Sequence, residues 1–171
     1  VYANWSASAP TPCASLKFDS LTIPPSVPQA KESTWRHVDY VPPMITFFTV
    51  PAGYDLAALG SATIAPGSIE FYDSSAIPGW RPSLVVTGMR TGSLYRVKLS
   101  GDGRSVVGPA QEYFHRANRY RDTAVSADGR RIYVVTDSEG SVLDANWQRT
   151  EVQAEPGALL EFVYAPAGSK Q

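Results

Sequence analysis

Three arginines fall within six positions of one short stretch, residues 116–121, in a chain whose formal net charge is only −1. Arg119 and Arg121 are two residues apart, so in an extended backbone both side chains leave the chain by the same face. Neighbouring guanidiniums repel one another unless an anion or a carboxylate lies between them, and arginine binds planar carboxylates and phosphates through parallel hydrogen bonds. This spacing predicts a site for a ligand that carries several negative charges.

Residues that could carry out acid–base or metal chemistry are scarce. His37 and His115 are the only candidates for an imidazole base, and neither lies beside a nucleophile or an orienting carboxylate in the sequence. No spacing of His, Cys, Asp or Glu matches a zinc site, and no calcium-binding EF-hand loop, phosphate-binding loop or nucleophile elbow occurs. Taken alone, these residues therefore predict no complete catalytic apparatus and no recognisable metal site.

Length and composition narrow the classes of partner. With 171 residues, 43% hydrophobic and 18% charged, the chain corresponds to one domain or less. Its near-zero net charge argues against nucleic acid, or a membrane surface, bound through bulk electrostatics. No run approaches the roughly 18–20 apolar residues that a membrane span needs. Because the chain begins at Val1 and not at methionine, we expect a processed product or a piece of a longer chain.

The organisation of the chain changes near residue 43. Residues 1–43 carry seven prolines and no sustained period, which predicts an irregular segment, whereas residues 44–171 carry repeated strand signals. The predicted strands are short, rich in β-branched or aromatic residues and bounded by turn residues: Met44–Val50, Ser68–Tyr72, Ser83–Thr87, Ser93–Leu99, Ala110–Phe114, Arg121–Ser126, Arg131–Thr136 and Ala158–Tyr164.

The predicted strands group by fours, which indicates an all-β fold built from consecutive antiparallel sheets. Residues 68–114 form one set, residues 121–164 give at least three strands of a second, and Met44–Val50 is expected to end a preceding one. Such repetition is typical of a β-propeller, although a β-sandwich remains open as an alternative. A propeller needs roughly 4–8 blades, and this chain supplies about two and a half.

The alternating direction of consecutive strands, which we call strand parity, predicts which loops lie at the same end of the fold. In an up-and-down blade, the link between blades and the link between the second and third strands open at the same end. Thr63, Arg90, Arg119 with Arg121, and Asp137 should therefore gather at one mouth, while the tight turns at 100–103 and 126–129 should lie at the other. The alternative is that each arginine pairs with a nearby acid: Arg121 with Asp122 or Asp137, and Arg90 with Glu70.

Landmarks along the whole chain resemble the C-terminal blades of the soluble quinoprotein glucose dehydrogenases, in the glucose/sorbosone dehydrogenase family. They include residues 118–122 (Asn-Arg-Tyr-Arg-Asp), 126–129 (Ser-Ala-Asp-Gly) and 132–137 (Ile-Tyr-Val-Val-Thr-Asp). Residues 2–7, 31–35, 41–43, 63–66, 79–80, 92–99 and 156–160 match further landmarks in the same order.

The resemblance implies part of a six-bladed β-propeller that binds pyrroloquinoline quinone, with Ca²⁺, and oxidises aldose sugars at C1. The quinone carries three carboxylates, which a cluster of arginines would suit. By position, Thr63, Arg119 and Arg121 match cofactor-binding residues of the family, and Met89 with Arg90 stands where the family has a Leu-Lys pair. Asp137 matches an acid at the same mouth and is placed to orient the arginines.

The resemblance covers only the C-terminal part of such an enzyme. The catalytic base and the calcium ligands are expected upstream of Val1, so the chain alone should be inactive without the N-terminal remainder of the propeller. Ala58 and Ser61 stand where the family has a disulfide-tethered loop beside the sugar, which leaves the identity of the sugar open. The implied protein is periplasmic or secreted, acts with an external electron acceptor, and is compatible with a homodimer.

The competing function is non-catalytic. A β-propeller segment could instead bind a carbohydrate or a protein partner, because propeller scaffolds carry many unrelated functions.

Overall fold

A computed structural model of the chain describes residues 2–3, 29–30, 34–48, 50–51, 53–55 and 62–166. The chain divides into two compact units, one of residues 1–43 and 50–61 and the other of residues 44–49 and 62–171. In the first unit, β1 (Tyr2–Ala3) and β2 (Gln29–Ala30) pair antiparallel. The second unit contains all the other strands and the residues predicted to bind a ligand.

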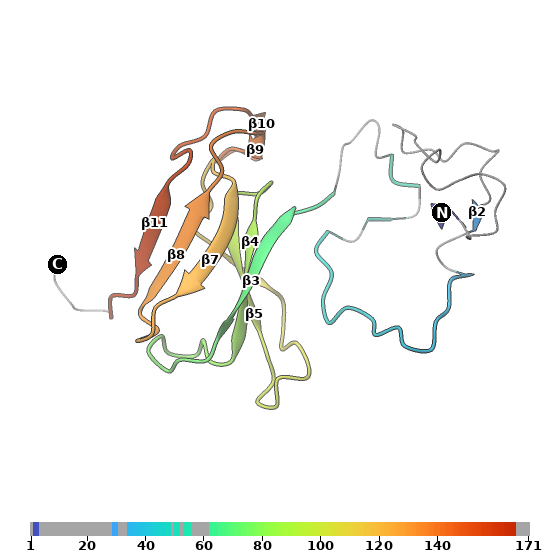
Figure 1. The fold of residues 1–171 in the computed structure, drawn as a ribbon, viewed down its shortest axis with the longest axis horizontal. Coiled ribbons are helices and arrows are strands. Elements are labelled where there is room, and N and C mark those ends of the chain that lie inside the picture. Colours follow the sequence, from blue (N-terminus) through green and yellow to red (C-terminus); the bar gives the residue numbers. More distant parts are fainter. Residues whose placement is uncertain are drawn as a thin grey trace. The chain divides into compact units, whose positions relative to one another are not determined.

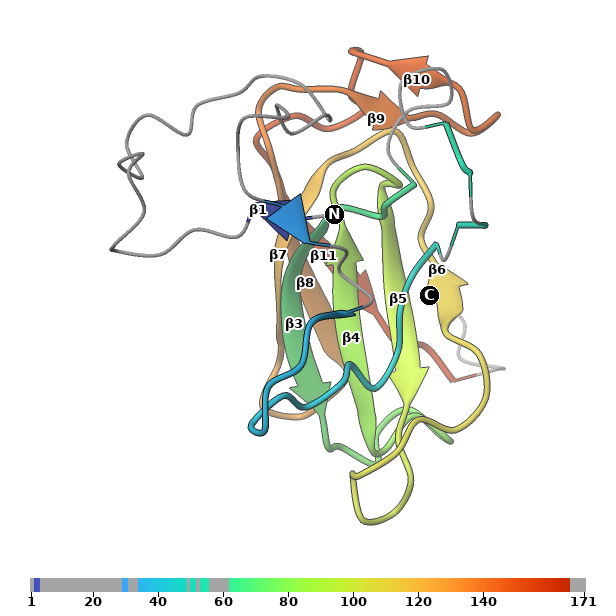
Figure 2. The ribbon, with the colours of Figure 1, turned by 90° about the vertical axis from the view of Figure 1, so that its right-hand side faces the viewer.

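The second unit contains one complete four-stranded sheet. Its strands are β3 (Pro66–Tyr72), β4 (Ser83–Gly88), β5 (Ser93–Lys98) and β6 (Gln111–Tyr113). They lie side by side in chain order, and each pair is antiparallel (Figure 2). This is the up-and-down arrangement of a propeller blade.

A second sheet has three strands. It consists of β7 (Tyr120–Val125), β8 (Arg131–Thr136) and β11 (Leu159–Val163), all antiparallel, with β8 in the middle. Between β8 and β11 the chain forms a small hairpin from β9 (Val142–Leu143) and β10 (Arg149–Thr150). The two sheets stand side by side, with β3 next to β7 (Figure 1).

Apolar residues at alternate strand positions build the core between the two sheets. Val85 of β4, Leu94 of β5 and Val134 of β8 are buried there together with two tyrosines, Tyr72 and Tyr120. The Tyr72 hydroxyl donates to the Gly129 carbonyl oxygen at 2.7 Å, which ties the end of β3 to the turn between β7 and β8. The core therefore fixes the inner strands of both sheets against each other.

Close backbone approach between the sheets requires a glycine in β3. A Cβ atom at Gly67 would overlap the Arg121 backbone oxygen and would lie 3.0 Å from the Tyr120 backbone oxygen. No side chain fits there unless one of the two strands moves. Gly67 thereby sets the position of the strand that carries Arg121.

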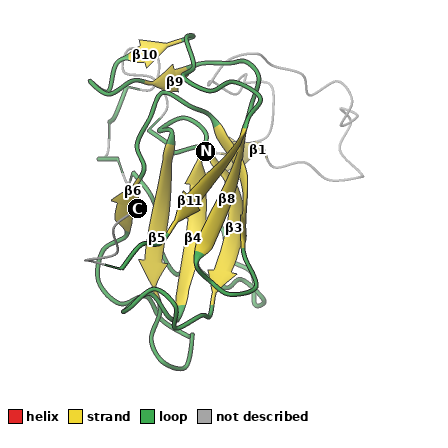
Figure 3. Cartoon of the chain, turned by 90° about the vertical axis from the view of Figure 1, so that its left-hand side faces the viewer, coloured by secondary structure: helices red, strands yellow, loops and turns green. Residues whose placement is uncertain are grey.

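The all-β fold predicted from the sequence is confirmed, since the described residues form antiparallel sheets and every named element among them is a β-strand (Figure 3). The two sheets of the second unit are consistent with a partial propeller. None of the described residues belongs to a helix that is long and apolar enough to cross a membrane.

One predicted strand is wrong. Residues 44–48 and 50 are not in a strand; Phe48 adopts a left-handed φ of 56°, and no strand among the described residues pairs with this segment. Ile45 and Phe47 instead pack on the face of the first sheet opposite the second, where the Phe47 ring lies 5.3 Å from that of Tyr95. The apolar residues that suggested a strand are thus used for packing without backbone pairing.

Candidate functional site

The loops predicted to share one mouth are joined there by backbone hydrogen bonds. The Met89 nitrogen donates to the Ala65 oxygen at 2.9 Å, and the Arg90 nitrogen donates to the Ile64 oxygen at 3.0 Å. Within the second sheet, the Asp137 nitrogen donates to the Arg119 oxygen at 2.9 Å. The segment that holds Thr63 therefore lies beside Met89 and Arg90, and Asp137 lies beside Arg119.

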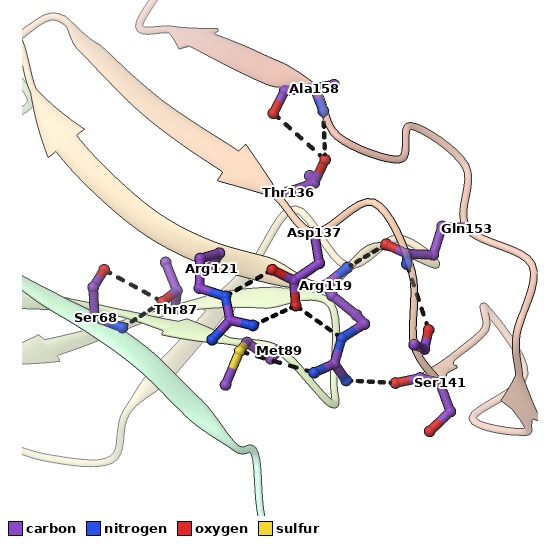
Figure 4. A network of polar contacts seen from close by, with 11 residues as sticks. Ser68, Thr87, Met89, Arg119, Arg121, Thr136, Asp137, Ser141, Gln153 and Ala158 are labelled. Carbon is purple, nitrogen blue, oxygen red and sulfur yellow. Dashed lines mark hydrogen bonds and ion pairs between the residues drawn. The ribbon is translucent and has the colours of Figure 1, made fainter.

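The β9–β10 hairpin connects these two groups. The Leu143 nitrogen donates to the Arg90 oxygen at 2.9 Å, so the hairpin of the second sheet contacts the β4–β5 turn of the first. The Arg119 Nη2 atom, 4.0 Å from the Met89 Sδ atom, makes a second contact across the same boundary (Figure 4). Strand parity thus predicted the grouping correctly, whereas the hairpin was not predicted.

Asp137 lies between the two arginines that the sequence singled out. Its carboxylate accepts from Arg119 Nε at 3.1 Å and from both Arg121 Nε and Arg121 Nη2, at 2.7 and 2.8 Å (Figure 4). The alternative pairing of Arg121 with Asp137 is therefore present. Because a single carboxylate is shared by two guanidiniums, one positive charge of the pair remains available to an anion.

The environment of Arg119 immobilises its side chain. Nη1 donates to the Ser141 backbone oxygen at 2.7 Å, and the backbone nitrogen donates to the Gln153 Oε1 atom at 3.2 Å. Gly140, with a φ of 103°, lies under the guanidinium, and a Cβ there would be 2.9 Å from Arg119 Nε. The side chain is 20% exposed. Arg119 is thus held in place before any ligand arrives.

Arg121 is the more accessible member of the pair, with 54% of its side chain exposed against 16% for Asp137. Hydrogen bonds from Arg121 lower the pKa of Asp137 below its ordinary value, while partial burial acts in the opposite direction. The Asp137 carboxylate in turn raises the pKa of Arg121. Asp137 and Arg121 are therefore both charged at neutral pH.

Arg90 and Thr63 keep polar groups that could bind a ligand. Arg90 is a half-buried residue, and among the described residues no acidic side chain forms an ion pair with it, so the alternative pairing with Glu70 is absent. The Thr63 Oγ1 atom accepts from the Ala65 nitrogen at 2.9 Å, which leaves the hydroxyl proton free to donate. The sequence predicted both residues for this mouth.

His115 has neighbours that the sequence did not reveal. Its Nδ1 lies 3.0 Å from the Ser93 Oγ atom and 3.8 Å from Glu112 Oε1, and its ring stacks on Trp147 of the hairpin at 4.5 Å. A serine, a histidine and an acid thus meet, but Ser93 is fully buried and its hydroxyl also donates to Glu112. A nucleophile must reach its substrate, so this cluster supports the hairpin and is no catalytic triad.

His37, in the first unit, is exposed, and its Nδ1 atom lies 3.7 Å from Asp39 Oδ2. Within the described part of the chain, no group of three His, Cys, Asp or Glu side chains is close enough to hold a metal ion. The expectation that a catalytic base and calcium ligands lie upstream of Val1 stays a prediction.

The groups brought together at this mouth fit a ligand with several carboxylates. Guanidiniums are the strongest carboxylate-binding groups in proteins, and a hydroxyl donor at Thr63 adds to them. Sequence reasoning missed Gly140, the Ser141 carbonyl and Gln153, which hold Arg119. Only the glycine gave a signal, and a backbone carbonyl gives none because every residue has one.

Comparison with known proteins identifies the family. Residues 49–144 match the glucose/sorbosone dehydrogenase family, and the chain is 33% identical over 173 aligned residues to quinoprotein glucose dehydrogenase B of Acinetobacter calcoaceticus. This chain belongs to the glucose/sorbosone dehydrogenase family. The aligned region covers 95% of this chain and 36% of that relative, so the chain spans about a third of the relative's length.

Proposed function

We propose that this chain is the C-terminal part of a pyrroloquinoline-quinone-dependent dehydrogenase that oxidises an aldose at C1 to the lactone. In this proposal, Arg90, Arg119 and Arg121 bind the carboxylates of the quinone, Thr63 and Met89 line its site, and Asp137 holds two of the arginines. The observation that carries the proposal is the Asp137 carboxylate shared by Arg119 and the half-exposed Arg121.

The chemistry of the donor set supports a polycarboxylate over a single anion. Arg119 and Arg121 belong to β7 and its preceding loop, whereas Arg90 comes from the β4–β5 turn of the other sheet. Cations supplied from two sheets can bind carboxylates at separate points of one planar molecule and so fix its orientation. A small anion such as phosphate would not use both.

The residues of this chain bind and orient; they transfer no proton. Bound quinone supplies the electron-accepting chemistry, and the part of the protein outside residues 1–171 supplies the base that removes the sugar hydroxyl proton. The Arg119 side chain is held in one position because Gly140, Ser141 and Asp137 restrain it. Arg121, which also pairs with Asp137, is the more accessible contact for a ligand. Met89, beside Arg119, adds an apolar surface.

The remaining parts of the proposal come from the family. Calcium ligands and the catalytic base lie outside residues 1–171, residues 1–171 alone are inactive, and the protein works in the periplasm or outside the cell with an external electron acceptor. Ala58 and Ser61, which the sequence places near the sugar, lie outside the described residues.

Quinone titration of the complete protein tests the proposal. Arg119→Ala and Arg121→Ala should each weaken quinone binding by about 10- to 100-fold, because a hydrogen bond to a charged group contributes about 1.5–3 kcal/mol. Arg104→Ala is the matched control: it removes the same charge from the β5–β6 link at the opposite end of the sheet, and should leave affinity unchanged.

The competing function has a distinct outcome. If Arg119→Ala and Arg121→Ala both bound quinone as tightly as the unmodified protein, the assignment of these two arginines to the quinone site would fail. Binding of a carbohydrate or a protein without any quinone affinity would then favour a non-catalytic propeller segment.

A further inference from the structure

The chain contains two methionines, Met44 and Met89, in different surroundings. Met44 is 49% exposed and precedes the first sheet. Met89 lies in the turn between β4 and β5, at the mouth that also holds the arginines, and is half-buried. A half-buried side chain at an open mouth can be reached by a small solute, so both methionines are exposed to reagents dissolved in the solvent.

The sulfur of Met89 contacts one nitrogen of Arg119. The Met89 Sδ atom lies 4.0 Å from Arg119 Nη2 (Figure 4). The other two nitrogens of this guanidinium have strong acceptors: Nε donates to the Asp137 carboxylate at 3.1 Å and Nη1 to the Ser141 carbonyl oxygen at 2.7 Å. Among the described residues, the thioether sulfur is the only acceptor that Nη2 contacts, and thioether sulfur is a weak acceptor. Nη2 is therefore the nitrogen of Arg119 that is most available to a stronger one.

The separation between these two atoms suits one additional oxygen atom. Oxidation of methionine adds an oxygen to the sulfur and converts an apolar side chain into a polar sulfoxide. An oxygen bonded to Sδ and hydrogen-bonded to Nη2 at the usual distance of about 2.9 Å, with a bent angle at the oxygen, fits the 4.0 Å separation. Because the donor is a charged guanidinium, this hydrogen bond would be of the strong, charge-assisted kind.

We propose that Met89 is a site of oxidation by hydrogen peroxide, and that the sulfoxide oxygen then occupies the Nη2 donor of Arg119. In this reaction the thioether sulfur attacks one oxygen of the peroxide, so that an S–O bond forms as the O–O bond breaks. The departing oxygen takes the proton from the transferred oxygen and leaves as water. The sulfur is oxidised by two electrons and the peroxide is reduced by two.

The restraint on Arg119 gives this modification a consequence at the mouth. Asp137, Ser141 and Gly140 hold the guanidinium in place, so it cannot turn away to offer Nη2 elsewhere. The sulfoxide oxygen would therefore compete with a ligand carboxylate for the same donor. This competition with quinone rests on the proposed function, whereas the oxidation of Met89 and its new hydrogen bond do not.

Peroxide treatment of the complete protein, followed by peptide mass spectrometry, tests the modification itself. Met89 should be converted to the sulfoxide under conditions that convert the more exposed Met44. Saturating quinone should slow the oxidation of Met89 and leave that of Met44 unchanged. A Met89 that stays unoxidised without quinone, while Met44 is fully converted, would overturn the inference.

Denaturant unfolding tests the hydrogen bond without any quinone. The change in midpoint on oxidation is measured with Met89 and with Met89→Leu, and the difference between them gives the effect of the Met89 sulfoxide alone. The same pair is then measured in the Arg119→Ala background. The sulfoxide should lower the midpoint more in that background, because its oxygen has lost the donor. An equal effect in both backgrounds would overturn the inference.

Quinone titration tests the competition, with each protein compared with its own state before treatment. Oxidation should weaken binding by about 10-fold or more where Met89 is present. The affinity of Met89→Leu should not change on treatment, and Met44→Leu is the matched control, which should lose affinity as the unmodified protein does. Equal losses with and without Met89 would overturn the inference. If the complete protein bound no quinone before treatment, the proposed function would fail, and the unfolding comparison would decide the fate of the oxidation site.

Discussion

The guanidinium of Arg121 binds both carboxylate oxygens of Asp137, through Nε at 2.7 Å and Nη2 at 2.8 Å. This two-point contact joins β7 to the loop after β8. The Arg119 Nε atom also donates to the same carboxylate. The acid therefore does more than neutralise charge, since it fixes the distance and the relative orientation of two cations. In the proposed function, this geometry sets the position of the quinone carboxylates.

Asp137→Asn should weaken quinone binding of the complete protein by about five- to tenfold. Asparagine keeps the shape but cannot hold two guanidiniums, and an exposed arginine released from its partner regains up to about 2 kcal/mol of side-chain entropy that the ligand must then overcome. Isothermal titration with the quinone measures the change.

The matched control for this variant is Asp128→Asn. Asp128 also has a lowered pKa, caused first by its hydrogen bond with Ser126, but it lies in the turn between β7 and β8 at the opposite end. This control should bind quinone normally. Tighter binding by Asp137→Asn would mean that the carboxylate competes with the ligand instead of positioning the arginines.

The contribution of Asp137 to stability should be lost only in acid. Its folded-state pKa lies below the ordinary 3.8, chiefly because of the hydrogen bonds from Arg121. A carboxyl with a depressed pKa stabilises the fold fully above its unfolded value and loses this effect as the pH falls through the folded value. The difference in unfolding free energy between the unmodified protein and Asp137→Asn should stay constant from pH 8 to about 5 and shrink below about 4. Denaturant titrations at several pH values measure it, and a change near neutral pH would contradict the assignment.

Gly67→Ala should destabilise the complete protein by about 1–3 kcal/mol and also weaken quinone binding. The added methyl group would overlap the Arg121 backbone oxygen, and backbone atoms cannot move aside as a flexible side chain can. The strand that carries Arg121 must therefore shift. Chemical denaturation and quinone titration measure the two effects.

Gly101→Ala is the control for that substitution. A Cβ at Gly101 would have nothing within 4 Å, and the residue does not have a positive φ. It should therefore be neutral or slightly stabilising. If Gly67→Ala lost no more stability than Gly101→Ala, the contact between β3 and β7 would not be tight.

Much of the candidate site could be predicted from the sequence because alternation and strand parity are local rules. The i, i+2 spacing of Arg119 and Arg121 put both side chains on one face, and parity grouped their loop with those of Arg90 and Asp137. What failed depended on partners distant in the chain. The segment Met44–Val50 has strand composition, but composition does not supply a partner strand.

The hairpin of β9 and β10 escaped prediction for a related reason. Each of its strands has only two residues, too few for an alternating pattern to be visible. Its turn is fixed instead by the Asp144 side chain, which accepts from the Asn146 and Gln148 nitrogens at 2.8 and 2.9 Å. Aspartate in a turn is common enough that it does not by itself indicate a hairpin.

Tyr72→Phe should destabilise the complete protein by about 1–3 kcal/mol, because the fully buried hydroxyl makes two hydrogen bonds. It donates to the Gly129 oxygen at 2.7 Å and accepts from the Ile77 nitrogen at 3.1 Å, so its loss leaves both backbone groups without this partner. Tyr113→Phe is the matched control, because the Tyr113 hydroxyl makes only an exposed contact with Gln111 at 3.2 Å. Denaturant unfolding should separate the two variants clearly, while quinone affinity should change in neither, since both hydroxyls lie away from the mouth. If Tyr72→Phe unfolded at the same denaturant concentration as Tyr113→Phe, the turn after β7 would not be held by β3.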